Sequence, residues 1–263
     1  MQVRKFLPIE CDVIVVDGLW GVGKTAVTSV IGAMKNVEKM RLDHVHEYVC
    51  TMNHLGKMAN DATRFMLVTY SDIDQYSNMI GREINFRPSD ASGTKNTPGS
   101  TIKYLRRLFS EDGDQIVDQI MSQNIANHVV THQVLPVGEP LFEAFGTRLK
   151  MVHIVRHPVH LARYWNDYLR DSLRHREFTV SFDVRGEKVP WWAANWAEEF
   201  IGMNTMDKAL ASISHLYELL IARFEQHRND PRLLVVSFED VVMRPQTSFP
   251  RIAEFLGREL SRK

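Results

Sequence analysis

Residues 18–25 read Gly-Leu-Trp-Gly-Val-Gly-Lys-Thr and fit the pattern Gly-x-x-x-x-Gly-Lys-Thr of a phosphate-binding loop. The glycines let the backbone turn around an anion and expose successive N–H groups. Lys24 adds a mobile cation, and the hydroxyl of Thr25 is of the kind that ligates Mg²⁺. We therefore predict that the phosphates of a nucleotide bind to Gly21, Val22, Gly23, Lys24, Thr25 and Ala26.

The elements around this loop fit the same interpretation. The apolar run at residues 12–16 predicts a buried strand before the loop, and apolar residues at positions 27, 30, 31 and 34 predict a helix after it. A helix N-terminus attracts phosphate through its free amides and its dipole. The strand before the loop and the helix after it therefore favour a phosphate-binding loop over a chance match to the motif in a tight turn.

Two more predicted strands end in polar residues that a core does not require. His132 follows the strand at residues 128–131, and Arg156 follows the strand at residues 151–155. An imidazole titrates near neutral pH and is a candidate general base, whereas a planar guanidinium suits bidentate phosphate binding. Two structural alternatives remain open: a histidine satisfied at a strand end, and an arginine paired with Asp167 or Glu239.

The remaining pattern alternates short apolar strands with amphipathic helices, which predicts an α/β fold with three layers and a central parallel sheet. Ligands bind at the carboxyl ends of the strands in such a sheet. A further strand is predicted at residues 44–50 and another at 233–236. Helices are predicted at residues 53–68, 116–125, 139–145 and 213–224, with a last helix that stops at Gly257.

Two further stretches have an unusual composition. Residues 85–100 are rich in Gly, Pro, Ser and Asn and predict a long surface loop that acts as a lid over the binding site. Trp191, Trp192 and Trp196 predict a buried helix face, with an acceptor-binding wall as the alternative.

Composition limits the classes of function. The 263 residues, 44% hydrophobic and 24% charged, predict one domain spanning residues 1–263. The net charge of zero argues against nucleic-acid binding by bulk electrostatics and favours a small anionic ligand. Cys11 and Cys50 show no metal-ligand spacing and no disulfide framework, which indicates a reducing cytoplasm, and the first ten residues contain no long apolar run that indicates a membrane anchor.

Taken in order, these stretches resemble the sulfotransferase family, which transfers a sulfuryl group from 3′-phosphoadenosine 5′-phosphosulfate (PAPS) on a P-loop NTPase-like fold. The loop at 18–25, the Thr-His segment at 129–136 and the strand ending in Arg-x-Pro at 150–158 carry the likeness. Residues 233–245 and 255–257 look like the late strand, Glu-Asp pair and terminal Phe-Leu-Gly helix of the family. The resemblance implies that His132 is catalytic and that Arg156 holds the 3′-phosphate.

The chain departs from the family pattern at two positions. The family commonly has a lysine where Gly21 stands, and here the lysine is Lys24, as in ATP-binding enzymes. Tyr164 occupies the place of a serine that shares the 3′-phosphate; its hydroxyl also donates hydrogen bonds, and Arg163 is a second candidate there.

Three hypotheses follow. The first is a sulfotransferase-like enzyme that uses PAPS without a metal, with Lys24 and His132 as catalytic residues and a hydroxyl or amine of a small molecule or glycan as acceptor. The second is a P-loop kinase that uses ATP and Mg²⁺, with Asp17 or the pair Glu239 and Asp240 near the metal. The third is a non-catalytic nucleotide-binding protein. Glu47, Asp72 and Asp74 are further candidates for acceptor contact.

Overall fold

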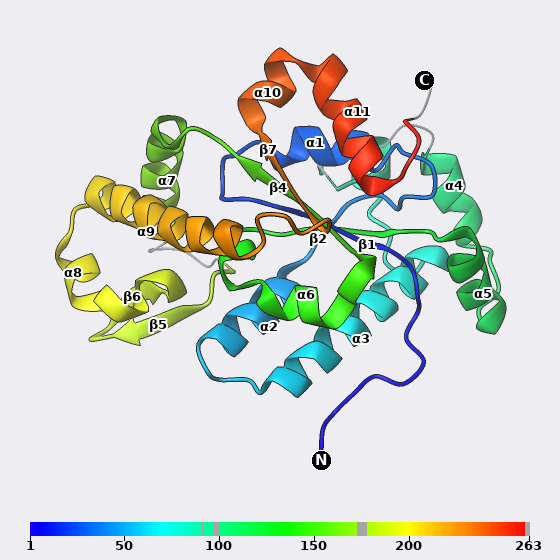
Figure 1. Cartoon of the computed structure of the whole chain (residues 1–263), viewed down its shortest axis with the longest axis horizontal. Helices are drawn as coiled ribbons and strands as arrows, with labels where there is room; N and C mark the ends of the chain where they lie inside the picture. Colours follow the sequence, from blue (N-terminus) through cyan, green and yellow to red (C-terminus); the bar gives the residue numbers. More distant parts are fainter. Residues whose placement is uncertain (91, 97–99, 173–177, 261–263) are drawn as a thin grey trace.

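Five parallel strands form the central sheet of the computed structural model, which describes residues 1–90, 92–96, 100–172 and 178–260 (Figure 1). In chain order the strands are β1 (Val13–Asp17), β2 (Arg41–Leu42), β3 (Asn127–Val130), β4 (Leu149–Val155) and β7 (Leu233–Ser237). Their order across the sheet is β2-β3-β1-β4-β7. All five residues of β1 are buried, as expected for a central strand covered on both faces.

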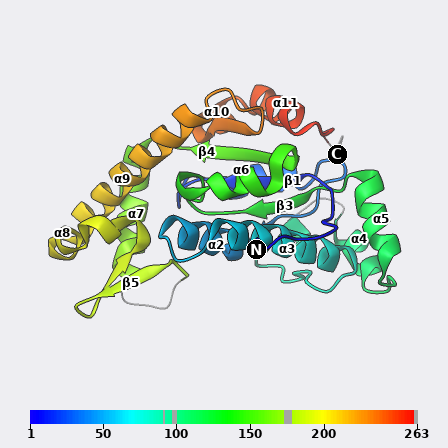
Figure 2. The same ribbon diagram turned by 60° about the horizontal axis from the view of Figure 1, so that its bottom comes forward.

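Helices cover both faces of the sheet. They are α1 (Lys24–Ile31), α2 (His44–His54), α3 (Asn60–Met79), α4 (Ser100–Arg107), α5 (Asp114–Gln123), α6 (Glu139–Phe145), α7 (Pro158–Ser172), α8 (Ala197–Gly202), α9 (Thr205–Gln226), α10 (Phe238–Met243) and α11 (Pro245–Leu256). In Figure 1, α1, α10 and α11 lie on one side of the sheet and α2, α3 and α6 on the other. In Figure 2, α6 lies in front of β4, β1 and β3, with α10 and α11 above these strands and α2 and α3 below them. The predicted three-layer α/β fold is therefore confirmed.

The register of the sheet brings the predicted polar strand ends together. Val16 of β1 pairs with Val130 of β3, and Asp17 pairs with His153 of β4. Because the three strands are parallel neighbours, the loop that follows β1 lies beside the residues that follow β3 and β4.

The prediction of a strand at residues 44–50 is wrong. These residues form the first half of α2, because the side chain of Asp43 caps the helix by accepting hydrogen bonds from the amides of Val45 and His46 at 2.7 and 3.2 Å. The helix predicted at 53–68 is divided between α2 and α3, which are separated by residues 55–59.

Most of the other predicted elements are confirmed as α5, α6, α9, β7 and α11, and Gly257 ends the last helix in the left-handed conformation with φ 63°. The tryptophan cluster instead forms a 3₁₀ helix, Trp191–Trp196, which follows the hairpin of β5 (Ser181–Val184) and β6 (Glu187–Pro190). Trp191 and Trp192 are buried.

Within residues 85–96, the described part of the predicted loop holds one 3₁₀ turn, Thr94–Asn96. Residues 91 and 97–99 lie outside the described chain. Closure of this loop over an acceptor stays a prediction. Among the helices of the described residues, none combines the length and apolar character needed to cross a membrane.

Candidate active site

The phosphate loop connects β1 to α1 in a conformation that requires glycine. Gly23 has φ 89°, and a Cβ atom built there would lie 2.1 Å from the ring of Phe238. Gly23 also caps α1 without a side-chain hydrogen bond, so the first amides of the helix have no side-chain partner at the cap. Thr25 and Ala26 are exposed in this first turn. The arrangement is suited to binding an anion at the end of α1.

Lys24, predicted to be a mobile cation, is instead held by the backbone of its own loop. Its side chain is buried, and Nζ donates hydrogen bonds to the carbonyls of Gly18 and Leu19, the latter at 3.0 Å. Burial lowers the pKa of Lys24 to about 8, opposed by the charges of Asp17 and Glu47. The ammonium thus closes the loop on itself, because a buried cation needs acceptors.

Asp17, the last residue of β1, is buried and forms hydrogen bonds with residues that follow β3 and with a residue of β4. Its carboxylate accepts hydrogen bonds from Thr131 Oγ1 at 2.8 Å and from Val134 N, Leu135 N and His153 Nδ1 at 3.0 Å each. Burial alone would raise the pKa of Asp17, but the hydrogen bond and charge of His153 and the charge of Lys24 hold the pKa below its usual range. With its oxygens engaged in this way, Asp17 is not placed to bind Mg²⁺ as the kinase hypothesis requires.

Glu239 and Asp240 lie in the first turn of α10, which follows β7 directly. Glu239 accepts hydrogen bonds from His157 N at 3.1 Å and Ser237 Oγ at 2.9 Å. The amide of Asp240 donates to Ser237 Oγ, which caps α10. The pair therefore belongs to the start of a helix, where both residues form a hydrogen bond with the side chain of the capping residue, Ser237.

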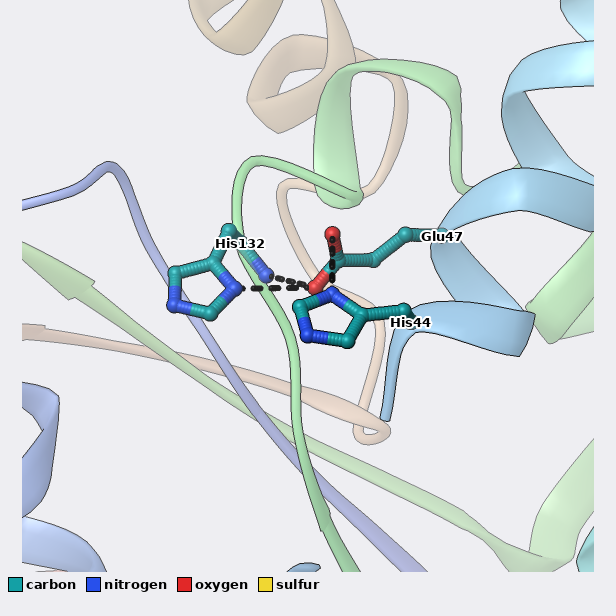
Figure 3. A group of neighbouring side chains, drawn as sticks. All are labelled: His44, Glu47 and His132. Carbon is teal, nitrogen blue, oxygen red and sulfur yellow. Dashed lines mark hydrogen bonds and ion pairs between the residues drawn. The ribbon is translucent and has the colours of Figure 1, made fainter. Parts of the chain in front are cut away.

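His132 and Glu47 form a hydrogen-bonded pair that the sequence did not predict (Figure 3). Glu47 Oε1 accepts from the backbone amide of His132 at 2.6 Å and lies 3.0 Å from its Nδ1. Because a carboxylate only accepts, Nδ1 carries the proton and Nε2 keeps a lone pair. The neighbouring amide of Gln133 donates to the carbonyl of Gly18 at 3.3 Å, so the His132 segment is attached to the phosphate loop.

A pocket of about 160 Å³ adjoins this pair. Its aromatic walls are Trp20, Tyr48, Tyr168, Phe178 and Trp191. His44, Glu47 and His132 line the same pocket. Since Trp20 belongs to the phosphate loop, the pocket lies next to the predicted phosphate site. Trp191 of the tryptophan cluster is buried and lines this pocket, and its contact with an acceptor stays a prediction.

Arg156 and Tyr164 lie together beside the phosphate loop. Arg156 Nη1 donates to the carbonyl of Gly21 at 2.8 Å, and its guanidinium lies 4.7 Å from the ring centre of Phe238. Among the described residues, no group accepts from the buried Nε of Arg156. The Tyr164 ring covers Gly21 so closely that a Cβ there would lie 2.9 Å from it. Both side chains therefore contact the same residue of the loop.

Two of the remaining candidates lie elsewhere. Asp74 forms an ion pair with Arg41 at 3.0 Å, and Asp72 accepts from the amide of Ile9 at 3.2 Å. Burial raises the pKa of both carboxyl groups to about 6. Of the three acidic candidates, Glu47 is the one that lines the aromatic pocket. Its neighbour His44, whose pKa Glu47 raises, was not among the predicted site residues.

The chain is similar along most of its length to several solved structures. The chain is similar to the solved sulfotransferase domain from the curacin biosynthetic pathway, with 14% identity, TM-score 0.49, and coverage of 98% of this chain and 77% of the other. The corresponding values for the sulfotransferase domain of the Synechococcus olefin synthase are 12%, 0.47, 99% and 78%, and for a Mycobacterium tuberculosis sulfotransferase 15%, 0.47, 96% and 69%. No curated protein matches the sequence significantly.

The family itself is shown by the sequence. Residues 73–263 match the family described as the sulfotransferase domain, a range that begins after the phosphate loop and contains His132 and Arg156. Because the match spans most of the chain, the protein belongs to the sulfotransferase family and is an enzyme of that class.

Proposed function

We propose that this sulfotransferase transfers a sulfuryl group from PAPS to a hydroxyl or amine of a small molecule or glycan that enters the aromatic pocket. The observation that carries the proposal is the placement of His132. Its imidazole lines the pocket, is oriented by Glu47 and belongs to a segment bonded to the phosphate loop. A base, an acceptor space and a phosphate site therefore adjoin one another.

On the donor side, the first amides of α1 and the ammonium of Lys24 hold the 5′-phosphosulfate. Binding exchanges the carbonyls of Gly18 and Leu19 for phosphate oxygens as partners of Lys24. The cation then stabilises the charge that develops on the leaving phosphate oxygen. Within the described ranges of the chain, Nε of Arg156 has no hydrogen-bond acceptor, which supports the assignment of Arg156 to the 3′-phosphate, with Tyr164 beside it.

On the acceptor side, the hydroxyl oxygen or amine nitrogen of the acceptor attacks sulfur, and Nε2 of His132 takes the proton that this group loses. The bond between sulfur and the bridging phosphate oxygen breaks, and adenosine 3′,5′-bisphosphate leaves. Glu47 stabilises the imidazolium that forms, since its carboxylate already accepts from Nδ1. We expect no requirement for a metal, because a sulfuryl group carries less charge than a phosphoryl group.

Thermal shift tests the donor. Adenosine 3′,5′-bisphosphate without metal should raise the unfolding midpoint more than adenosine 5′-phosphate or ATP with Mg²⁺, since a ligand at 100 times its Kd stabilises the native state by about 2.7 kcal/mol. Transfer from radiolabelled PAPS to a panel of alcohols, phenols and amines then tests the reaction with and without a chelator. Transfer of phosphate from ATP would instead support the kinase hypothesis.

We further propose that the protein works in a reducing compartment such as the cytoplasm. Support comes from Cys11 and Cys50, which are both free, buried thiols. The unfolding midpoint should be the same with and without a thiol reductant.

A further inference from the structure

Three side chains with metal-binding atoms, His44, Glu47 and His132, lie close together (Figure 3). All three line the aromatic pocket. His44 and Glu47 are three residues apart at the start of α2 and therefore face the same way, whereas His132 comes from the end of β3. Their donor atoms all lie within 4.8 Å of one another. Glu47 Oε1 is 3.0 Å from His132 Nδ1, and Glu47 Oε2 is 3.8 Å from His44 Nδ1.

These separations are close to those of a zinc site. Zn²⁺ binds imidazole nitrogen and carboxylate oxygen at about 2.0–2.2 Å, so two ligands of a tetrahedral ion are roughly 3.3 Å apart. The contacts of Glu47 with His132 and with His44 lie on either side of that value. Small rotations of the side chains would bring all three groups onto one ion.

We propose that the pocket binds Zn²⁺ through Nδ1 of His44, Nδ1 of His132 and the carboxylate of Glu47. Three protein ligands leave a fourth coordination position, which faces the pocket. Two imidazoles and one carboxylate form a donor set known from zinc enzymes, and they disfavour Mg²⁺ and Ca²⁺, which prefer oxygen ligands.

The surroundings of the cluster suit an ion that enters from solvent. The side chains of His44, Glu47 and His132 are 35%, 15% and 19% exposed. The amide of His132 donates to Glu47 and fixes its carboxylate, and the ring of His44 stacks on Phe178 with centroids 5.1 Å apart. Partners of this kind orient the ligands before the metal arrives.

Zinc at this site would switch off the base. In the free enzyme Nδ1 of His132 carries the proton and Nε2 carries the lone pair. Coordination of zinc to Nδ1 moves the proton to Nε2, so the imidazole can no longer accept a proton from the acceptor. Zn²⁺ is therefore a reversible inhibitor of transfer. This consequence rests on the proposed role of His132, whereas the binding of zinc does not.

Titration of the full chain, after removal of metals with a chelator, tests binding directly. Calorimetry or competition with a zinc-binding dye should show one Zn²⁺ per chain at micromolar concentration or below. His44→Ala removes a ligand and should weaken binding by at least about 100-fold, since loss of an outer-shell partner alone costs about 10–100-fold. The visible spectrum of bound Co²⁺ should show low coordination in the wild type and change in the variant.

His215→Ala is the matched control. His215 also lies three residues before a glutamate, Glu218, at 4.0 Å, but this pair is on α9 and outside the pocket-lining set. This variant should bind zinc like the wild type. Binding of adenosine 3′,5′-bisphosphate reports whether each variant is folded.

For each protein, the rate of sulfuryl transfer with zinc is divided by the rate of the same protein without zinc. Inhibition of the wild type that is relieved by a chelator and weakened in His44→Ala supports the switch. Equal zinc affinity in wild type and His44→Ala, or no binding by the wild type at micromolar zinc, overturns the site. If zinc binds as described but does not slow transfer, the site is supported and the inhibition is overturned. If no transfer can be measured, the titration alone still tests whether the site binds zinc.

Discussion

The contact between Glu47 and His132 allows a quantitative prediction for Glu47→Gln. The substitution keeps an oxygen near the amide and Nδ1 of His132 but removes the charge that faces the imidazolium during transfer. A hydrogen bond to a charged group contributes about 1.5–3 kcal/mol. At about 1.36 kcal/mol per factor of ten, kcat should fall roughly 10- to 150-fold. Donor affinity should change little, because the carboxylate contacts the base and not the nucleotide.

A double-mutant cycle separates this effect from general damage to the fold. His132→Asn alone should lower kcat by about 10²–10⁴-fold, the usual contribution of a positioned base. In the His132→Asn background, Glu47→Gln should lower kcat hardly further, because the group that Glu47 orients is gone. The coupling energy should therefore be about 1.5–3 kcal/mol.

The rate constant of sulfuryl transfer is measured under single-turnover conditions at saturating donor for the wild type, the two single variants and the double variant. Donor affinity by calorimetry and the unfolding midpoint accompany each measurement. The reasoning is refuted if Glu47→Gln slows transfer by the same factor in both backgrounds, or if its effect appears in donor affinity instead of turnover.

Three further perturbations test other parts of the structure. Lys24→Ala should weaken binding of 5′-phosphorylated nucleotides by about 1.5–3 kcal/mol in calorimetry, the value of a charge-assisted hydrogen bond, and unchanged affinity in a folded variant would remove Lys24 from the site. Arg156→Ala should cost about 2–5 kcal/mol of affinity for adenosine 3′,5′-bisphosphate and much less for adenosine 5′-phosphate, whereas equal losses would contradict a 3′-phosphate contact. Asp72 has a pKa raised by burial from 3.8 to about 6, so the native state binds its proton more tightly than the unfolded chain, and wild-type stability should fall as the pH rises through this interval. Asp72→Asn should reduce the pH dependence of the free energy of unfolding measured in urea, with the share of Asp74 remaining because its pKa is raised in the same way, and should raise stability at neutral pH by about 1–2 kcal/mol after allowance for solvent screening. An unchanged pH dependence in the variant would rule out a contribution from Asp72.

The parts of the structure that could be predicted are encoded locally. The apolar run of β1, the glycines of the phosphate loop and the polar residues after β3 and β4 are each recognisable within a few positions of the chain. Parallel pairing then brings His132 and Arg156 to one edge without further information.

The parts that could not be predicted depend on distant contacts or on a missed cap. Glu47 and His132 are 85 positions apart, and nothing near either residue indicates their hydrogen bond. The direction of Lys24 depends on the carbonyls of the folded loop. The error at residues 44–50 was avoidable, because Asp43 in the capping position and Glu47 in the first turn are helix-start signals that outweigh loose alternation.

The buried carboxylate of Asp17 holds one part of the site in place through its hydrogen bonds. Its hydrogen bonds join residues 131–135, the segment that contains His132, to the end of β1 and to His153 of β4. The pocket walls Tyr48, Phe178 and Trp191 come from elements outside this bonded set. Under the proposed function, substitutions in these walls would change the shape of the acceptor space, while Asp17 would continue to hold the segment that follows β3. In protein engineering that starts from the proposed function, these three positions would be the ones to vary in order to change acceptor preference, and Asp17 would be kept.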